Sequence, residues 1–334
     1  MPRTYLRVMR KRPNPYYQGP VSDHFDGERF FVPGHKQDKS RGDLMRMAGG
    51  SRARWPRPIP SPYAPKPDAH VAGLRSTLIG HASFLVQAAG LNLLIDPVFA
   101  RRASPFTFAG PVRANPPGIA LDDLPPIHAV LITHSHYDHM DKQALRALAR
   151  RHRPRFICPL GVDVLLRHQR VGAPDVTALD WWDAAEFGPL AIHAVPTYHW
   201  SARGLRDRRQ TLWCSFAIAT PSGLLYHIGD TGYGAGQFSK QLRDRLGAPQ
   251  LAHIPIGAYE PRWFMKDAHV NPEEAVQIFQ DCGAEQAIGH HWGTFQLTHE
   301  QHDQPEKDLA LALAASGIAS GRFQAFRPGQ VLDV

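Results

Sequence analysis

The nine residues THSHYDHMD at 133–141 contain three histidines and two aspartates, and they follow directly on the apolar run AVLI at 129–132. Such a run predicts a buried strand, and Leu145 and Leu148 in the following KQALRALARR have helical spacing. The polar cluster is therefore expected in a loop between a strand and a helix. The chain must fold so that a core strand ends at a dense group of imidazole and carboxylate side chains.

His134, His136, Asp138 and His139 have the spacing H-x-H-x-D-H. In an extended stretch alternate side chains share one face, so His134 and His136 point the same way, and the turn into the helix lets Asp138 and His139 face a second point nearby. Imidazole and carboxylate are natural zinc ligands, and the same donor set leaves iron and manganese open. Four side chains cannot complete two metal sites, so other segments must supply more.

Further candidate ligands stand at the ends of predicted strands. They are His199 in VPTYHW, Asp230 in HIGDTGYG and the pair His290 and His291 in GHHWGT. Because adjacent residues of a strand face opposite sides, only one histidine of the pair is expected to reach the metals.

From about residue 74 the chain shows short apolar strands separated by turns, and 74–80, 83–88 and 91–96 form a predicted meander. Pro272 opens a helix with Asn271 as its N-cap. The strands fall into two runs with helices interspersed, which predicts an α/β fold of two packed sheets covered by helices. The other predicted strands are 129–133, 155–159, 190–196, 212–219, 224–230 and 286–291.

The basic charge of the chain is concentrated before the first of these strands. Residues 1–67 hold 14 Lys and Arg against 5 Asp and Glu, and 11 of the 30 prolines. The rest of the chain is close to neutral. A basic, proline-rich segment is expected to wrap or extend rather than fold alone. It either packs along the domain as a solvated arm or is attracted to an anionic surface, a phospholipid membrane or nucleic acid.

The cysteines Cys158, Cys214 and Cys282 lie far apart without C-x-x-C spacing, which predicts free buried thiols in a reducing compartment. The first residues have no apolar stretch of the kind found in signal peptides, and no run approaches the roughly 20 apolar residues of a membrane-spanning helix. We therefore expect a cytoplasmic protein, at most peripheral to a membrane.

The order of these motifs resembles the metallo-β-lactamase superfamily, and more narrowly the N-acyl-phosphatidylethanolamine-hydrolysing phospholipase D family. The resemblance covers residues 74–300 and implies an αββα sandwich of two mixed sheets flanked by helices. We expect the catalytic domain at 71–334, after the basic, proline-rich arm at 1–70, which carries none of these motifs. The motifs that carry the resemblance are GHASFLV, LIDPVF, ASPFTFAGPVR, LPPIHAVLITHSHYDHMD, GDTGYG, PIGAYEPRWFMK, HVNPEEAV and HWGTF.

The resemblance also implies how the ligands are shared between two zinc ions. The ligand of the family directly precedes Trp-Gly-Thr, which selects His291 and makes His290 structural. Asp230 is expected to bridge the two ions. The first ion is assigned to His134, His136 and His199, and the second to Asp138, His139 and His291.

The activity implied is that of a dinuclear-zinc phosphodiesterase. A metal-bridging hydroxide would cleave an N-acyl-phosphatidylethanolamine-like phospholipid to phosphatidic acid and an N-acylethanolamine, with Asp230 and His269 as catalytic residues. The basic arm would provide peripheral membrane contact, nucleic acid is not expected as a partner, and a homodimer is compatible with the family. The alternatives are a hydrolase of lactones or sugar-phosphate lactones, a nuclease, a non-catalytic metal-binding protein and an iron redox enzyme.

Outside the ligand set, five residues are candidates for contacts around the metals. Asp96 in LIDPVF either orients a ligand histidine or forms the turn before Pro97, and His81 either lines the site or is a polar turn residue. His269 either donates a proton to the leaving oxygen or binds phosphate. Trp200 and Tyr259 wall the pocket, unless they are plain core aromatics.

Overall fold

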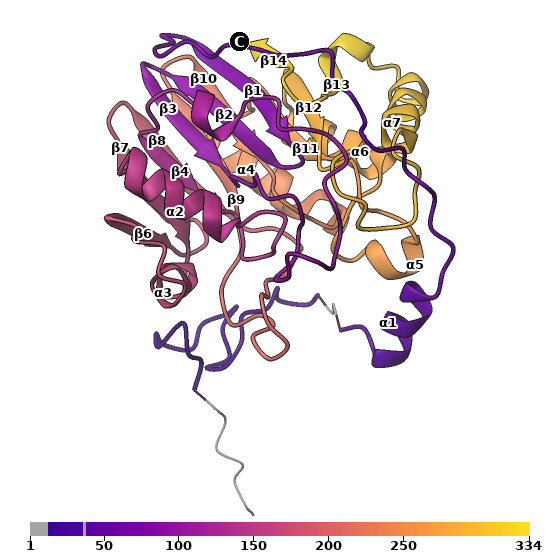
Figure 1. Ribbon diagram of the computed structural model, residues 1–334, viewed down its shortest axis with the longest axis horizontal. Coiled ribbons are helices and arrows are strands. Elements are labelled where there is room, and N and C mark those ends of the chain that lie inside the picture. Colours follow the sequence, from indigo (N-terminus) through magenta and orange to yellow (C-terminus); the bar gives the residue numbers. More distant parts are fainter. Residues whose placement is uncertain (1–12, 36–37) are drawn as a thin grey trace, which may run out of the picture.

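In the computed structural model, which describes residues 13–35 and 38–334, two seven-stranded sheets pack face to face between helices (Figure 1). This architecture confirms the predicted αββα sandwich. The first sheet has the order β14 (Val331–Asp333), β1 (Leu74–Gly80), β2 (Ser83–Ala88), β3 (Leu91–Ile95), β4 (Ala129–Leu131), β5 (Arg155–Pro159) and β6 (Asp175–Leu179). The second has the order β13 (Phe323–Ala325), β12 (Gln286–His290), β11 (Leu251–Pro255), β10 (Gly223–His227), β9 (Ser215–Thr220), β8 (Leu190–Val195) and β7 (Ala184–Phe187).

Both sheets are mixed. In the first, β14 to β3 pair antiparallel and β3 to β6 pair parallel; in the second, β7 to β10 pair antiparallel and β10 to β13 pair parallel. The helices are α1 (Arg41–Ala48), α2 (Lys142–Arg151), α3 (Val162–His168), α4 (Gln237–Leu246), α5 (Arg262–Met265), α6 (Pro272–Cys282) and α7 (Gln304–Ala315). None of these helices, within the residues described, is long and apolar enough to cross a bilayer.

Side chains alternate between two cores along the central strands. On β2, Phe84 and Val86 lie between the sheets, whereas Leu85 packs under α2 and α3. A third core lies between the second sheet and the helices α4, α6 and α7. Because both faces of these sheets are covered, their strands read as continuous apolar runs, which is why the sequence revealed them. The three cysteines are free and buried, as predicted.

The two helices predicted from the sequence, α2 and α6, each begin at an N-cap residue. Asp141 caps α2 by accepting hydrogen bonds from the backbone N–H groups of Gln143 and Ala144. Asn271 and Glu274 form a capping box at the start of α6, with Pro272 in its first turn. The cap of α2 fixes the point at which the histidine-rich loop must end.

The described part of the arm, 13–35 and 38–70, packs along the domain. Phe25, Phe30 and Val32 join Leu212 and Trp213 in one buried cluster. Farther along, backbone N–H groups of the arm donate to the domain, from Ala53 to His299 and from Ile59 to Ala114. Residues 1–12 and 36–37, which belong to the predicted arm, lie outside the described residues. The predicted boundary at residue 70 stays a prediction.

We expect Phe30→Ala to destabilise the protein by about 3–5 kcal/mol, because it removes a fully buried ring. The centroid of the Phe30 ring lies 4.7 Å from that of Phe25, and loss of the Phe30 ring would leave a cavity beside Trp213. Urea unfolding measures the change. Val21→Ala is the matched control: Val21 is 69% exposed on the same arm, and its loss should change stability by less than about 0.5 kcal/mol. Equal stability of the two variants would show that the arm does not pack stably against the domain.

Docking of the arm is expected to depend on pH through His24. Its Nδ1 lies 2.6 Å from Asp23 and its Nε2 lies 2.8 Å from Asp180, while its ring stacks on Trp181. Burial opposes the charge, but the hydrogen bonds to Asp180 and Asp23 raise the pKa of His24 above its usual value. The folded state therefore binds the proton more tightly than the unfolded state does. The contribution of His24 to the stability of the folded state is fully present below about pH 6.5 and is lost as the pH rises through the raised pKa of His24. Urea unfolding across this range checks it, and Asp180→Asn should flatten the profile.

Candidate metal centre

The candidate ligands meet because each follows the carboxyl end of a strand. His134, His136, Asp138 and His139 lie between β4 and α2. His199 follows β8, Asp230 follows β10 and His291 follows β12. The first group comes from the first sheet and the others from the second, so the site lies where strand ends of both sheets converge. All seven side chains lie within two groups of buried histidines and aspartates.

The first group consists of His134, His136, His199 and Asp230. The Nδ1 of His136 lies 2.9 Å from the Nε2 of His134 and 3.2 Å from the Nε2 of His199. Asp230 Oδ2 lies 3.7 Å from His134 Nε2 and 3.6 Å from His199 Nε2. Ligand atoms around one tetrahedral zinc at its usual bond lengths are about 3.3 Å apart, so this spacing fits a metal cation.

The second group consists of His81, Asp138, His139 and His291. Asp138 Oδ2 lies 3.4 Å from His291 Nε2 and 3.7 Å from His139 Nε2. Asp230 also reaches this group, with Oδ2 3.2 Å from His139 Nε2 and Oδ1 3.0 Å from His291 Nε2. Asp230 therefore lies between the two groups, at the position the resemblance gives to a bridging ligand.

Burial and charge in the two groups favour bound cations. Among the described residues, the buried atoms His139 Nε2, His291 Nε2 and Asp230 Oδ1 have no hydrogen-bond partner of ordinary geometry. Burial lowers the pKa of His136 to about 4, so its imidazole is neutral and keeps a lone pair, as a ligand must. Burial opposes a charge on His291, yet Asp230 and Asp138 raise its pKa to about 9. A proton there takes the place that a metal cation would fill.

Groups behind the ligands fix the orientation of three imidazole rings. Thr133 Oγ1 lies 2.9 Å from His134 Nδ1, Asp96 Oδ2 lies 2.7 Å from His139 Nδ1, and the carbonyl oxygen of Ala268 lies 3.0 Å from His199 Nδ1. Each contact turns the Nε2 of the histidine toward the site. The sequence suggested Asp96 but not Thr133, whose hydroxyl also donates to Asp96. Asp96 has a φ of 43° before Pro97, so it serves the turn as well.

Asp96→Asn is expected to weaken metal binding by about 10–100-fold, the usual effect of losing a residue that orients a ligand. The amide keeps the shape of the side chain but replaces one oxygen with an N–H₂ group. This group would face either the backbone N–H of Thr133 or the pair of donors Thr133 Oγ1 and His139 Nδ1, so one set of contacts is lost. Metal titration with a competing chelator measures the affinity. Asp122→Asn, at an exposed carboxylate, is the matched control. Equal affinity in the two variants would mean that Asp96 serves only the turn.

The other predicted residues lie at different distances from the ligands. His81 Nε2 is 2.9 Å from Asp138 Oδ2, and the Trp200 ring centroid is 4.5 Å from that of His136. His269 Nε2 is 3.9 Å from Asp230 Oδ2. The contacts of Tyr259 lead away from the ligands, since its hydroxyl donates to Asp308 on α7 at 2.5 Å.

His290 and His291 take different environments, as expected for adjacent residues. His291 has a φ of 66° and turns its Nε2 to Asp138 and Asp230. His290 Nε2 donates to the carbonyl oxygen of Ile228 inside the sandwich. There its ring stacks on that of His227, which in turn contacts His253. His253 Nε2 forms a hydrogen bond of 2.8 Å with Ser76 Oγ of the first sheet. The sequence did not single out His227 or His253, because lone histidines within strands carry no motif.

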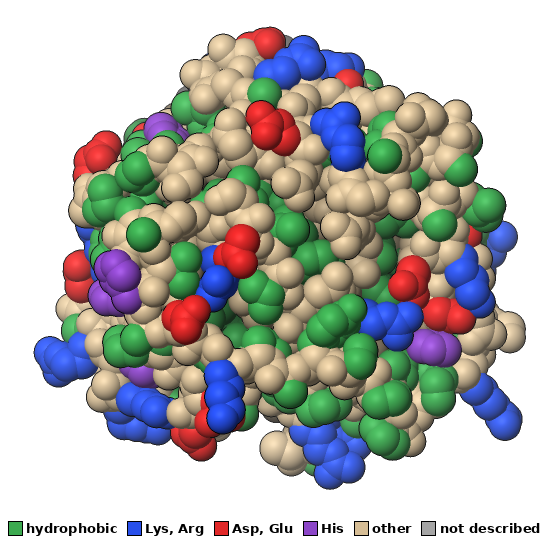
Figure 2. Space-filling view, turned by 90° about the horizontal axis from the view of Figure 1, so that it is seen from above, with side chains coloured by type: hydrophobic (Ala, Val, Ile, Leu, Met, Phe, Trp, Pro, Cys, Tyr) green, Lys and Arg blue, Asp and Glu red, His purple; other side chains and the backbone are tan. Residues whose placement is uncertain are grey.

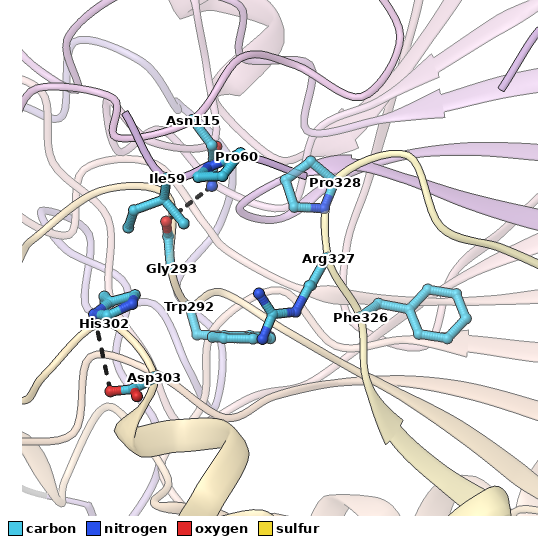
Figure 3. A pocket seen from close by; sticks show the side chains of 10 residues that line it. All are labelled: Ile59, Pro60, Asn115, Trp292, Gly293, His302, Asp303, Phe326, Arg327 and Pro328. Carbon is cyan, nitrogen blue, oxygen red and sulfur yellow. Dashed lines mark hydrogen bonds and ion pairs between the residues drawn. The ribbon is translucent and has the colours of Figure 1, made fainter. Parts of the chain in front are cut away.

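The loop after His291 is supported by distant segments. Asn115 Nδ2 donates to the carbonyl oxygen of Gly293 at 2.8 Å (Figure 3). A cavity of about 20 Å³ beside Trp292 is closed by Ile59 and Pro60 of the arm and by Arg327 and Pro328 (Figure 3). This volume suits about one water molecule, so it is a packing gap and not a substrate pocket. The arm thus backs the loop that carries His291.

Comparisons with known proteins agree with this geometry. A family model described as a Beta-lactamase superfamily domain matches residues 91–292, which include all seven candidate ligands. The chain is 39% identical over 247 residues to N-acyl-phosphatidylethanolamine-hydrolyzing phospholipase D 1 of Caenorhabditis elegans, across 71% of this chain and 69% of that protein. It is 32% identical over 249 residues to the mitochondrial N-acyl-phosphatidylethanolamine-hydrolyzing phospholipase D of Saccharomyces cerevisiae, across 73% of this chain and 52% of that protein. A solved structure from Veillonella parvula, described as a possible metal-dependent hydrolase, superposes with a TM-score of 0.62 at 17% identity, covering 79% of this chain and 100% of that one. This last likeness shows the fold alone.

Proposed function

The chain belongs to the metallo-β-lactamase superfamily and is a metal-dependent hydrolase, and we propose that it acts as a phospholipase D-type phosphodiesterase on N-acyl-phosphatidylethanolamine-like lipids. The proposal rests on the position of Asp230, whose carboxylate lies within 4 Å of histidines in both ligand groups. The lipid is suggested by the two relatives that carry this activity in their names.

We assign two zinc ions to the site, one to each ligand group, with Asp230 shared between them. The first ion would be held by His134, His136 and His199, and the second by Asp138, His139 and His291. Zinc pairs of this kind supply Lewis acidity and lower the pKa of water to about 7. The chain itself would hold the donors rigid, since the Nδ1 atoms of His134, His139 and His199 are already engaged.

His269 would act from the rim of the site. Its Nδ1 has no hydrogen-bond partner among the described residues, and its side chain is 11% exposed. Burial lowers the pKa of His269 to about 4, so at neutral pH the ring has one N–H and one lone pair. A neutral imidazole is a poor acid but a good hydrogen-bond donor. We therefore assign His269 to binding a phosphate oxygen and not to protonating the leaving oxygen.

The test is steady-state turnover by purified protein of known metal content. We expect hydrolysis of both N-acyl-phosphatidylethanolamine and a soluble aryl phosphodiester, with phosphatidic acid released from the lipid. Hydrolysis of the aryl ester alone would keep the phosphodiesterase and discard the lipid. Turnover of a lactone with neither phosphodiester cleaved would overturn the proposal in favour of the alternative chemistry on the same fold.

Location and metal belong to the same proposal. We place the protein in the cytoplasm at a membrane surface, and the three free buried thiols support a reducing compartment. We assign zinc on the resemblance to the phospholipase D family, because imidazole and carboxylate donors also suit iron and manganese, and metal analysis of protein purified without added metal tests that choice. The homodimer stays a prediction.

A further inference from the structure

A short hairpin, residues 102–112, lies beside the metal-binding loop, residues 132–141, and presents two aromatic rings to solvent. Phe106 is 55% exposed and Phe108 is 78% exposed, with ring centroids 5.4 Å apart. The hairpin is held in shape from within: Arg102 donates from Nε to the carbonyl oxygen of Thr107 at 3.0 Å and from Nη1 to that of Gly110 at 2.6 Å. Exposed aromatic side chains on a preformed loop are costly in water unless they meet an apolar partner.

The charged residues within the segment that carries this hairpin are all basic. Residues 97–121 contain Arg101, Arg102 and Arg113 and no aspartate or glutamate. The groove next to the hairpin has a volume of about 680 Å³, and its lining includes four basic side chains against the single acid Asp141: Arg101, Arg102, Lys142 and Arg203. The surface seen from above, on the side of β14, differs from this: its acidic and basic side chains are intermixed (Figure 2).

A second loop, residues 200–210, extends the same surface. Leu205 at its tip and the neighbouring Arg206 are exposed, and the loop contains four arginines against the single acid Asp207. One of these arginines, Arg209, is paired with Asp38 at 3.2 Å. Arg203 Nη1 donates to the carbonyl oxygens of Ser135 and Met140, which ties this loop to the metal-binding loop. The first residue of the loop, Trp200, lies against His136.

We propose that the hairpin 102–112 and the loop 200–210 together dock the protein onto an anionic phospholipid membrane beside its metal centre. The inference rests on the proposed function for its choice of ligand and adds the surface by which the enzyme meets the lipid. Aromatic and leucine side chains enter the interface between head groups and acyl chains, while the exposed Arg101 and Arg206 meet anionic head groups. Nucleic acid would satisfy the arginines but not the protruding Phe106, Phe108 and Leu205 as a set. The docking surface is thus separate from the basic arm, whose Phe25 and Phe30 are buried in the domain.

The experiment is co-sedimentation of the full chain with vesicles of phosphatidylcholine alone and of phosphatidylcholine mixed with phosphatidylglycerol. We expect binding to the anionic vesicles, weakened by salt, and about tenfold weaker binding when Phe106→Ser and Phe108→Ser are combined. Arg101→Ala should weaken anionic binding and leave the neutral vesicles unaffected. Leu311→Ser is the matched control, because Leu311 is 70% exposed on α7, outside both loops, and this variant should bind like the wild type.

Turnover of a soluble aryl phosphodiester by the double variant should equal that of the wild type, which separates docking from folding and from metal binding. Equal vesicle binding by the double variant and the wild type would overturn the proposal. So would binding to a single-stranded oligonucleotide that exceeds binding to anionic vesicles and depends on the same two phenylalanines. Because vesicle binding is measured without turnover, failure of docking and failure of the phosphodiesterase proposal are separate results.

Discussion

Replacing Asp230 with asparagine is expected to lower kcat/KM for an aryl phosphodiester by more than about 100-fold, beyond the effect of losing a residue that only orients a ligand. The carboxylate lies within 4 Å of His134, His139, His199 and His291, so one amide would disturb both ligand groups. The substitution removes a negative charge and turns a donor N–H₂ toward buried imidazoles. Metal content and kinetics should be measured on the same preparation, because loss of metal and loss of activity are expected together.

The matched control for this variant is Asp123→Asn, the same chemical change at an exposed carboxylate before β4. It should keep full activity and full metal content. Circular dichroism of both variants checks that the sandwich has formed. If the Asp230→Asn protein holds two equivalents of metal and turns over substrate normally, Asp230 is not a metal ligand. That result would contradict the proposal that the two metal ions share its carboxylate.

Removing the metal is expected to lower the melting temperature by about 10 °C or more. A ligand present at a thousand times its Kd stabilises the folded state by about 4 kcal/mol at each site, and two sites are proposed. Without cations, Asp138 and Asp230 face the same small space with only buried histidines to balance them. Chelator-treated protein should recover its melting temperature on addition of zinc, and comparison with manganese and iron ranks the three metals.

The Phe30→Ala variant is the control that separates metal loss from general weakening. It should melt at a lower temperature in both the loaded and the stripped state, with the same difference between them as in the wild type. A wild-type melting temperature that does not respond to chelation, in protein shown to have lost its metal, would contradict a metal centre built into the fold.

The parts of this fold that could be predicted from the sequence are those with a local cause. Strands β1 to β5 are buried on both faces, so their apolar runs are visible. The caps of α2 and α6 also leave a short signature in the sequence. The capping box of Ser40 and Asp43 at α1 leaves one as well, although α1 was not among the predicted helices. The candidate ligands were predictable because they stand directly after strands.

Other parts depend on contacts between distant residues. Strand β6 is only partly buried along most of its length, so it has no continuous apolar run to find. Helix α4 has the polar sequence QFSKQLRDRL and buries only Ser239 and Leu242. The pairing of β14 with β1 joins Thr77 to Val331, and no local pattern connects them. Thr133 and His227 act through partners that only the folded chain brings close, so their chemistry was not readable in advance.

The spread of the ligands along the chain bears on how the protein matures during synthesis. His134, His136, Asp138 and His139 leave the ribosome first, but His291 follows more than a hundred residues later. Until then a nascent chain displays three imidazoles and a carboxylate without the partners that bury them, and any nearby ion that binds such donors can reach them. Correct loading of the second group must therefore wait for β12 to pair, which makes the choice of metal in the cell a question of timing as well as of affinity.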